Sequence, residues 1–290
     1  MDNILRGQLN DYPVRFFCAN TSASVEALRQ IHNCTATASA AVGRLLTAAM
    51  IMGVMMKGEN DKLSLIIKGD GPIGKIVVTS DSCGRAKCDI ENPDIDVLVN
   101  DAGKLDVAKA VGSGKLTIIK DIGLKTPYNS TTELISSEIA EDIAYYYAVS
   151  EQIPTVCSLG VLVEKDSSIA CAGGYLIQVM PNCDEEVIDY LENRINEMPK
   201  ITEMLNHNMS GTDIIDKIFS EGNYKYTIEQ NIEPKYYCDC NYDKAEVIIK
   251  SLGVKELGDI IEKNEDLELK CHFCNKTYNF SIDRIKAFLN

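Results

Sequence analysis

The stretch that decides the organisation of this chain is residues 267–280, LELKCHFCNKTYNF, in which Cys271 and Cys274 lie between two short runs of strand character. A second close pair, Cys238 and Cys240, lies upstream with 30 residues between the pairs. Four thiolates in two close pairs satisfy the tetrahedral coordination of a structural Zn²⁺ site. A segment of about sixty residues rarely folds unaided, so a metal staple is expected here. The sequence therefore predicts one Zn²⁺ per chain, bound by these four cysteines.

The turn within the second pair leads to further expectations. His272 is a rival metal ligand, but four thiolates already complete a tetrahedral site, so we expect it to be an exposed turn residue. Asn275 follows the pair, and asparagine tolerates the positive φ that a chain reversing around a metal often needs. Without the metal, Cys271 and Cys274 can readily close a disulfide, whereas a ring through the first pair would be strained and more reducible. The predicted site is therefore also an oxidisable clamp.

The composition and the first residues indicate in which compartment the protein works and which classes of partner it does not bind. The 290 residues carry 43 acidic and 29 basic side chains, a net charge of −14. This excess argues against nucleic acid or an anionic membrane as the main partner, since both are bound through clustered Lys and Arg. The first residues show no basic and apolar leader, so we expect a cytoplasmic protein with reduced thiols. In that compartment paired cysteines indicate metal or redox chemistry.

The longest apolar stretch is residues 35–56, TATASAAVGRLLTAAMIMGVMM, which contains Arg44 and is dominated by small residues in its first half. A membrane-spanning helix needs about 20 predominantly apolar residues without such a charge. We therefore expect a buried helix with close small-residue packing. Its methionines could offer an adaptable client surface, but we expect them to be core residues. They are Met50, Met52, Met55 and Met56.

Residues 1–180 are predicted to form a mixed α/β domain. Short alternating or fully apolar runs indicate strands, and apolar residues three and four apart indicate helices. The predicted strands are residues 13–18, 62–68, 75–79, 115–120, 158–164 and 175–179, and the predicted helices are residues 23–33, 38–56 and 136–149. The last helix is expected to place Ile139, Ile143, Tyr146 and Tyr147 on one face.

Residues 181–232 differ in charge and pattern. Residues 181–230 hold 11 acidic and 4 basic side chains, so half of the net charge lies there. We expect Thr212-Asp213 to cap the second of two helices in this segment. A self-repelling segment with narrow apolar stripes is stable only when docked on a neighbour, which predicts a metastable acidic helical linker. The two stripes are Val187, Leu191, Ile195 and Met198, and then Ile214, Ile215, Ile218 and Phe219.

Residues 233–290 are predicted to form a small C-terminal zinc-binding domain. Ser281 is expected to cap a last helix over residues 281–289, and residues 267–270 and 277–280 to form two strands. Two further helices are indicated by Val247, Ile248 and Leu252, and by Leu257, Ile260 and Ile261. The predicted fold class is α+β: a mixed α/β N-terminal domain, a helical linker and a small all-thiolate zinc domain.

With these motifs in place, the chain resembles the heat shock protein 33 family of redox-regulated holdase chaperones. The resemblance covers essentially the whole length, because the family's CxC and CxxC pairs match the two cysteine pairs at about this separation. Three upstream segments look like the family's own, in its order, and residues 250–280 are similar to its zinc domain. The upstream segments are residues 43–78 (GRLLTAAMIMGVMMKGENDKLSLIIKGDGPIGKIVV), 136–155 (SSEIAEDIAYYYAVSEQIPT) and 159–181 (LGVLVEKDSSIACAGGYLIQVMP).

The resemblance implies an ATP-independent holdase, not an enzyme, that is inactive while reduced and zinc-bound. Oxidation would form Cys271–Cys274 and Cys238–Cys240 disulfides, release zinc, unfold the C-terminal domain and linker, and expose hydrophobic surface. Unfolding client proteins would bind there and be protected from aggregation under oxidative stress. The activated form would be a homodimer built on residues 1–180.

Two other function classes stay open. A thiol–disulfide oxidoreductase using Cys271 and Cys274 needs only the CxxC spacing, but the thioredoxin-like βαβ setting is absent and all four thiols are assigned to a metal. A zinc-dependent nucleic-acid binder fits the acidic terminal module poorly.

The sequence departs from the family pattern in seven further cysteines, where members usually have fewer. Most lie in apolar surroundings, and we expect them to be inert core residues. Two of them flank a possible hairpin turn, so a local disulfide between Cys83 and Cys88 is conceivable. The seven are Cys18, Cys34, Cys83, Cys88, Cys157, Cys171 and Cys183.

Overall fold

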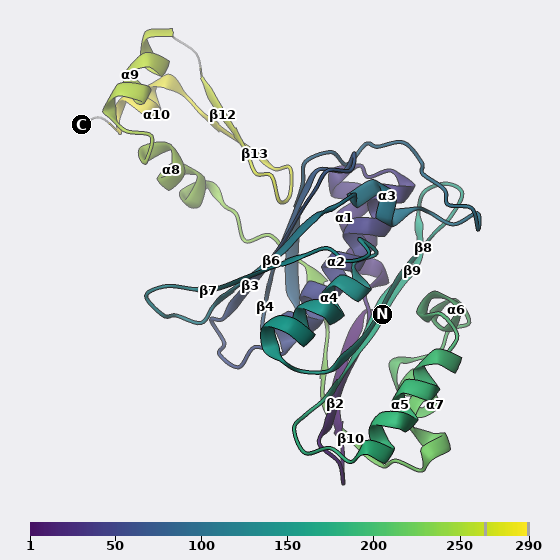
Figure 1. The fold of residues 1–290 in the computed structure, drawn as a ribbon. Helices are drawn as coiled ribbons and strands as arrows, with labels where there is room; N and C mark the ends of the chain where they lie inside the picture. Colours follow the sequence, from purple (N-terminus) through teal and green to yellow (C-terminus); the bar gives the residue numbers. More distant parts are fainter. Residues whose placement is uncertain (264–265, 289–290) are drawn as a thin grey trace. The chain divides into compact units, whose positions relative to one another are not determined.

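The computed structural model describes residues 1–263 and 266–288, which form two compact units, Met1–Tyr237 and Cys238–Asn290 (Figure 1). Residues 181–237 pack with residues 1–180 in the first unit. The sequence predicts boundaries after residues 180 and 232, and it stays a prediction that the linker and the C-terminal domain behave as separate folding units.

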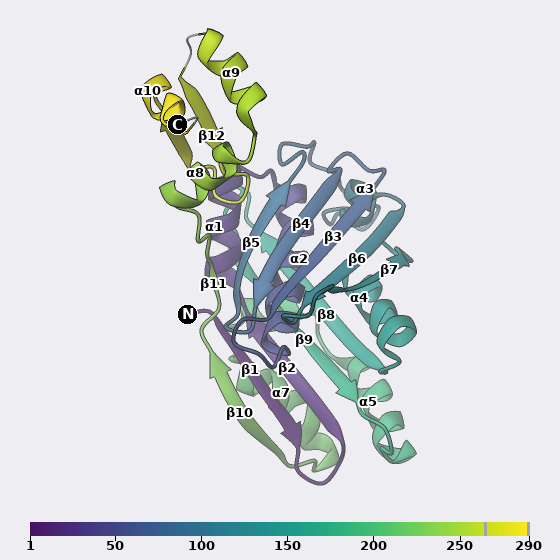
Figure 2. The ribbon, with the colours of Figure 1, turned by 90° about the vertical axis from the view of Figure 1, so that its left-hand side faces the viewer.

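The first unit is built on two sheets (Figure 2). One has the order β10-β1-β2-β9-β8 and is antiparallel throughout. Its strands are β1 (Asn3–Leu9), β2 (Val14–Asn20), β8 (Thr155–Val163), β9 (Ile169–Val179) and β10 (Tyr226–Ile232). The predicted strands at 13–18, 158–164 and 175–179 are confirmed as β2, β8 and the end of β9.

The other sheet has the order β11-β5-β4-β3-β6-β7, in which β11 alone runs parallel to its neighbour. Its strands are β3 (Lys62–Gly69), β4 (Lys75–Asp81), β5 (Arg85–Ile90), β6 (Gly114–Asp121), β7 (Tyr128–Glu133) and β11 (Lys235–Tyr236). The predicted strands at 62–68, 75–79 and 115–120 are confirmed. The short helix α3 (Val107–Val111) precedes β6.

Helix α2 (Ala36–Val54) packs against strands of both sheets. It is long and apolar enough to cross a membrane, but 94% of its apolar window is buried inside the protein. The prediction of a buried core helix is therefore confirmed. Its close packing needs small residues: a Cβ on Gly43 would lie 2.7 Å from Val25 Cγ1 and 2.9 Å from Val161 Cγ2.

Two other predicted helices are confirmed with changed bounds. Helix α1 (Ser22–His32) begins where Asp2 accepts hydrogen bonds from the backbone of Ala23 and Ser24, at 2.8 Å each. The helix expected over 136–149 is α4 (Ala140–Tyr146), continued by a π-helical turn (Tyr147–Glu151). The predicted face is confirmed, since its four residues are buried: Ile139, Ile143, Tyr146 and Tyr147.

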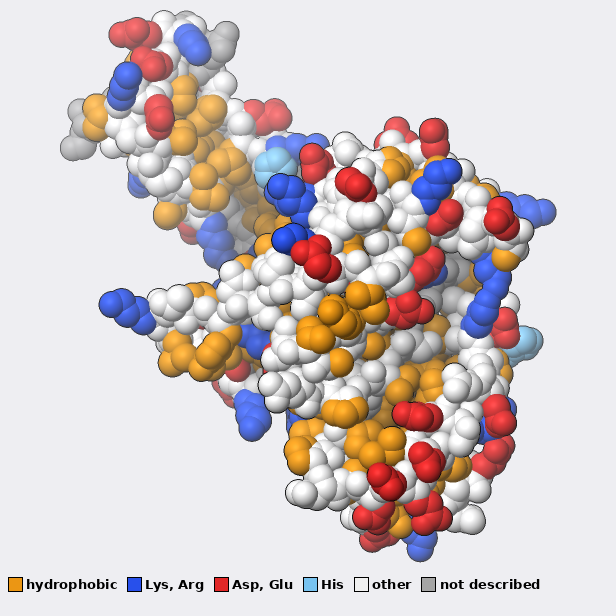
Figure 3. Space-filling view, in the orientation of Figure 1, with side chains coloured by type: hydrophobic (Ala, Val, Ile, Leu, Met, Phe, Trp, Pro, Cys, Tyr) orange, Lys and Arg blue, Asp and Glu red, His pale blue; other side chains and the backbone are white. Residues whose placement is uncertain are grey.

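The acidic segment forms a helical layer on the five-stranded sheet, made of α5 (Glu185–Glu197), α6 (Ile201–Asn206) and α7 (Gly211–Phe219). Its apolar residues share one cluster with side chains of β1, β2 and β9, and its acidic side chains gather on the outer surface (Figure 3). Both predicted helices are confirmed, but the predicted cap is wrong: the hydroxyl of Ser210, not Thr212, accepts from the Asp213 N–H at 3.2 Å. Strand β10 was not predicted: Tyr226, Ile228 and Ile232 lie at alternate positions, but Gln230 interrupts the pattern.

The second unit contains α8 (Tyr242–Lys250), α9 (Val254–Lys263), α10 (Ile282–Lys286) and the hairpin β12 (Leu267–Lys270) to β13 (Thr277–Phe280). Both strands and the Ser281 cap are confirmed, but α10 ends at Lys286; Leu289, which we placed in this helix, lies outside the described residues. The helix predicted from Val247, Ile248 and Leu252 is confirmed as α8, although Val247 and Ile248 are exposed. The small core consists of Ala245, Ile249, Leu257, Phe280 and Ile285.

Candidate metal centre

The second unit brings the four predicted ligand cysteines together. The Sγ atoms of Cys238, Cys240, Cys271 and Cys274 all lie within 4.8 Å of one another. The first pair comes from the segment that leads into α8, and the second from the turn between β12 and β13. Residues 31 and more positions apart in the chain therefore meet because the hairpin and the start of α8 share one small core.

Backbone hydrogen bonds fix the turn of the second pair. The N–H of Asn275 donates to the carbonyl of Cys271 at 2.8 Å, and the N–H of Cys271 donates to the carbonyl of Lys276 at 2.9 Å. Asn275 has a φ of 56°, so the predicted positive φ is confirmed. His272 is exposed and outside the thiol group, as expected.

The entry of the first pair is held by the start of α8. The Asn241 side chain caps this helix by accepting a hydrogen bond from the Lys244 N–H at 2.8 Å. The Lys244 ammonium donates to the carbonyl of Asp239 at 3.1 Å and pairs with its carboxylate. The residue between the two cysteines is thereby tied to the helix that follows them.

The spacing of the thiols suits a tetrahedral metal ion. Zn–S bonds of about 2.3 Å in a tetrahedron place the sulfur atoms about 3.8 Å apart. The Sγ atoms of Cys238 and Cys271 are 3.7 Å apart, and those of Cys240 and Cys274 are 3.2 Å apart. Each of these two contacts joins a cysteine of the first pair to one of the second, as expected where two short segments cross around one centre. Four soft thiolates favour Zn²⁺ over hard divalent cations.

The thiols differ in acidity. Burial raises the pKa of Cys238 to about 11. Burial also opposes ionisation of Cys240, but hydrogen bonds from Tyr278 and the neighbouring thiols outweigh it and lower its pKa to about 7. The pKa of Cys274 is raised, mainly by burial. Metal binding must therefore displace protons from Cys238 and Cys274, while Cys240 is ready to ionise near neutral pH.

Tyr278 is the residue near the metal centre that the sequence analysis missed. Its hydroxyl donates to the Sγ of Cys240 at 3.2 Å. Its position could have been inferred, because the second strand of a hairpin runs back past the turn that holds Cys271 and Cys274.

The seven other cysteines belong to the first unit and are free thiols. Cys18, Cys34, Cys88 and Cys171 are buried, and Cys157 and Cys183 are half-buried. Burial raises the pKa of all six, in Cys18, Cys34 and Cys157 to about 12. High thiol pKa values suppress reactivity, which supports the expectation of inert residues. Cys83 is exposed, in the turn before β5.

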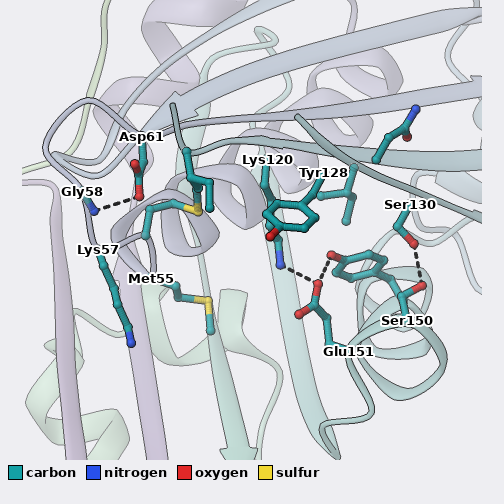
Figure 4. Close-up of a pocket in the computed structure, with 14 residues that line it drawn as sticks. Met55, Lys57, Gly58, Asp61, Lys120, Tyr128, Ser130, Ser150 and Glu151 are labelled. Atoms are coloured by element: carbon teal, nitrogen blue, oxygen red, sulfur yellow. Dashed lines mark hydrogen bonds and ion pairs between the residues drawn. The ribbon is translucent and has the colours of Figure 1, made fainter. Parts of the chain in front are cut away.

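The first unit has a cavity of about 690 Å³ between the end of α2, strands β6 and β7, and the π-helical turn. Figure 4 shows the residues that line it. Glu151 accepts hydrogen bonds there from the Lys120 ammonium and the Tyr146 hydroxyl. Met50 and Met52 are buried core residues as expected, whereas Met55 and Met56 line this cavity.

Comparison with known proteins connects this architecture to one family. A family model described as Hsp33 protein matches residues 2–281. The 33 kDa chaperonin of Clostridium botulinum strain Langeland is 44% identical over 289 residues, which cover 99% of this chain and 97% of that protein. The 33 kDa chaperonin of Agathobacter rectalis is 42% identical over 285 residues, 98% of each chain.

A solved structure agrees with the fold. The crystal structure of the 33 kDa chaperonin (heat shock protein 33 homolog) of Thermotoga maritima matches with a TM-score of 0.91 and 35% identity, over 99% of this chain and 97% of that chain. The predicted α+β fold class and the sequence resemblance are both confirmed. Since the family model and the relatives span nearly the whole chain, this protein belongs to the Hsp33 protein family of chaperones.

Proposed function

We propose that this protein is a redox-regulated, ATP-independent holdase of the cytoplasm, inactive while reduced and zinc-bound. Cys238, Cys240, Cys271 and Cys274 hold one Zn²⁺ per chain. Oxidants of the peroxide type activate the protein, which then protects unfolding proteins from aggregation. The observation that carries this proposal is the cluster of four thiols within 4.8 Å, in a unit with a small core.

The oxidation step is balanced as follows. In the zinc-bound state, four thiolates and two peroxides, with four protons taken up from water, give two disulfides, one Zn²⁺ and four waters. The proposed disulfides join Cys271 to Cys274 and Cys238 to Cys240. Zinc leaves because a disulfide sulfur is no longer a thiolate ligand.

Loss of the metal is expected to unfold the second unit. Structural zinc contributes about 10–16 kcal/mol of apparent binding free energy in small domains. The five buried apolar residues of this unit supply a far smaller core than the first unit has. The folded state of the second unit is therefore coupled to zinc, which makes it the bistable element of the switch.

Release of the acidic helical layer would expose the client surface. Beneath it lie apolar side chains of the five-stranded sheet, including Phe16, Tyr175 and Ile177, and the layer itself adds Leu191 and Phe219. Exposed apolar patches of this kind bind other apolar chains, while the acidic residues of α5 to α7 keep a loaded complex soluble. The active form is proposed to be a homodimer.

Peroxide treatment of the purified full-length protein tests the switch. We expect release of one zinc, loss of four free thiols, and suppression of the aggregation of a heat-denatured client without ATP. Cys83→Ser, which removes an exposed thiol outside the metal centre, should behave as the wild type. Zinc release without any gain in suppression would refute the proposed activity.

Disulfide mapping tests the proposed pairing separately. Peptides joined through Cys271–Cys274 and Cys238–Cys240 are expected. Bonds that join Cys238 to Cys271 and Cys240 to Cys274, whose Sγ atoms are 3.7 and 3.2 Å apart, would refute the pairing but leave the switch intact.

The oxidoreductase alternative has weaker support. Cys271 and Cys274 lie in a β-hairpin turn rather than at a helix N-terminus, so no helix dipole activates either thiol. The relatives are named chaperonins. Catalytic reduction of insulin at low protein concentration would favour this alternative instead.

A further inference from the structure

The edge of strand β5 is covered by the residues that immediately precede Cys238. β11 adds a two-residue parallel strand beside β5. The N–H of Lys235 donates to the Gly84 carbonyl at 3.3 Å, and the N–H of Tyr237 donates to the Ala86 carbonyl at 2.8 Å. Because Cys238 is the next residue, the chain passes from this sheet edge directly into the metal centre.

The Tyr236 side chain extends this cover by one more position. The N–H of Cys88 donates to the Tyr236 hydroxyl at 3.1 Å, and that hydroxyl lies 3.2 Å from the Cys88 carbonyl, to which it donates. These are the two backbone groups that a longer neighbouring strand would bind next, since alternate residues face the edge. His32 Nε2 lies 3.0 Å from the same hydroxyl.

This cover is short, and Tyr236 is the side chain that ties it to the backbone of β5. Tyr236 is half-buried, whereas the Tyr237 ring is 43% exposed and lies between the charged ends of Arg85 and Lys235, at 5.3 and 5.4 Å. A two-residue strand has little else to hold it, so its position depends on Tyr236 and on the ordered chain that follows.

We propose that residues 235–237 form an internal strap over a docking edge for unfolded polypeptide, and that loss of the metal centre releases this strap. The proposal rests on the proposed holdase function. The occupant of the freed edge is an extended segment of a client, bound through its backbone as the strap is. Backbone pairing with a sheet edge is largely independent of side chains, which suits clients of unrelated sequence.

Paired tyrosine variants test the strap without any oxidation. In the reduced, zinc-loaded full-length protein, Tyr236→Phe leaves two backbone groups of Cys88 without their partner, and the thiol of Cys88 is buried in the core that β5 helps to form. We expect alkylation of Cys88, followed by mass spectrometry, to be about tenfold faster. Tyr237→Phe should not change it, because among the described residues the Tyr237 hydroxyl makes no hydrogen bond. Equal rates in both variants would overturn the strap.

Photo-crosslinking tests the docking edge in chains that keep the native residues 235–237. A photoreactive phenylalanine analogue replaces Asp89 on β5 or, as the control, Asn129 on β7 at the opposite edge of the same sheet. The client is thermally unfolding citrate synthase. After oxidation we expect crosslinks from position 89 at least fivefold above those of the reduced protein, with no such rise at position 129.

Three outcomes distinguish a failure of the docking edge from a failure of the holdase function. Oxidised protein that suppresses aggregation but crosslinks no better at position 89 than before would overturn the docking edge and leave the holdase function standing. An equal rise at both positions would also overturn it, because binding would then not select the strapped edge. Failure to suppress aggregation would refute the holdase function itself, and the client role of the edge with it.

Discussion

At the residue scale, the metal centre is tuned by a side chain that is not a ligand. The Tyr278 hydroxyl donates to the Sγ of Cys240 at 3.2 Å and helps to lower the pKa of this thiol to about 7. A hydrogen bond to a thiolate stabilises its charge, and such partners of metal ligands commonly contribute tenfold or more in affinity. Tyr278 therefore supports the ionised form that a metal needs.

Tyr278→Phe is expected to weaken zinc affinity about tenfold, because it removes this hydrogen bond and little else. Competition with a chromogenic chelator under reducing conditions measures the change. The matched control is Tyr242→Phe, whose ring stacks on Phe280 at 4.6 Å but whose hydroxyl makes no hydrogen bond among the described residues. Equal affinities in the two variants would show that the hydrogen bond does not matter for zinc.

A second residue-scale prediction concerns pH. Glu26 accepts hydrogen bonds from Arg29, Gln30 and the N–H of Ile169, and these, the one from Arg29 foremost, lower its pKa from 4.5 to about 2. A depressed folded-state pKa stabilises the fold above the unfolded value near 4.5, and this contribution is lost as the pH falls toward 2.

Glu26→Gln is expected to lower the free energy of unfolding by about 1 kcal/mol at pH 7, with a gap to the wild type that shrinks below pH 4.5. Urea unfolding of both proteins between pH 7 and pH 3 measures it. Glu192→Gln, at an exposed position of α5, is the control and should cost little at any pH. A gap that stays constant across this range would contradict the assignment.

At the element scale, the helical layer is held by its ends as well as by its apolar face. In α7, the Ser210 hydroxyl accepts from the Asp213 N–H, and the Asp213 carboxylate accepts from the Ser210 N–H at 2.8 Å. The buried Arg194 of α5 donates to the Lys217 carbonyl at 2.7 and 2.9 Å near the other end of α7. These polar contacts set how easily the layer separates from the sheet.

Ser210→Ala is expected to destabilise α7 by about 1 kcal/mol, because it removes the acceptor of the cap. Thr212→Ala, two residues further along the chain, should destabilise α7 less, since the Thr212 hydroxyl makes no hydrogen bond among the described residues. Hydrogen exchange of the peptide that covers α7 measures both. The cap assignment fails if the two variants lose equal protection.

Apolar periodicity in the sequence predicted some helices and strands and missed others. It predicted α2, α5 and α7 and six of the eleven strands of the first unit, because each buries one face against a larger core. It missed β1, β5, β7, β10 and β11, and it did not identify the residues that α8 buries. Strand β10 is largely exposed and held by backbone pairing with β1, and α8 buries only Ala245 and Ile249 in a core too small to impose a full stripe.

At the scale of the whole molecule, the two units differ in what stabilises them. The first unit has two large apolar clusters around its sheets, whereas the second has five buried apolar residues and four clustered thiols. A loss of metal is therefore expected to act on the second unit first, and on the helical layer only through the chain that joins them.

Chelation of the reduced protein should separate the two responses. Hydrogen exchange after removal of zinc is expected to show loss of protection across residues 238–288, while β3, β4 and β6 keep theirs. Restored protection on adding zinc would serve as the control for reversibility. Retained protection in the second unit would mean that its apolar core folds without the metal.

The sequence by itself determined the four-cysteine group, which is positioned to bind a metal ion, and the core helix. Two close cysteine pairs, and a long apolar run interrupted by one arginine, can be recognised from local sequence alone. Only the tertiary structure decided which distant segments meet: Cys240 beside Cys274, β10 beside β1, and residues 235–237 on the edge of β5. Those contacts rest on backbone pairing and shared burial between segments far apart in the chain, and local periodicity does not encode either.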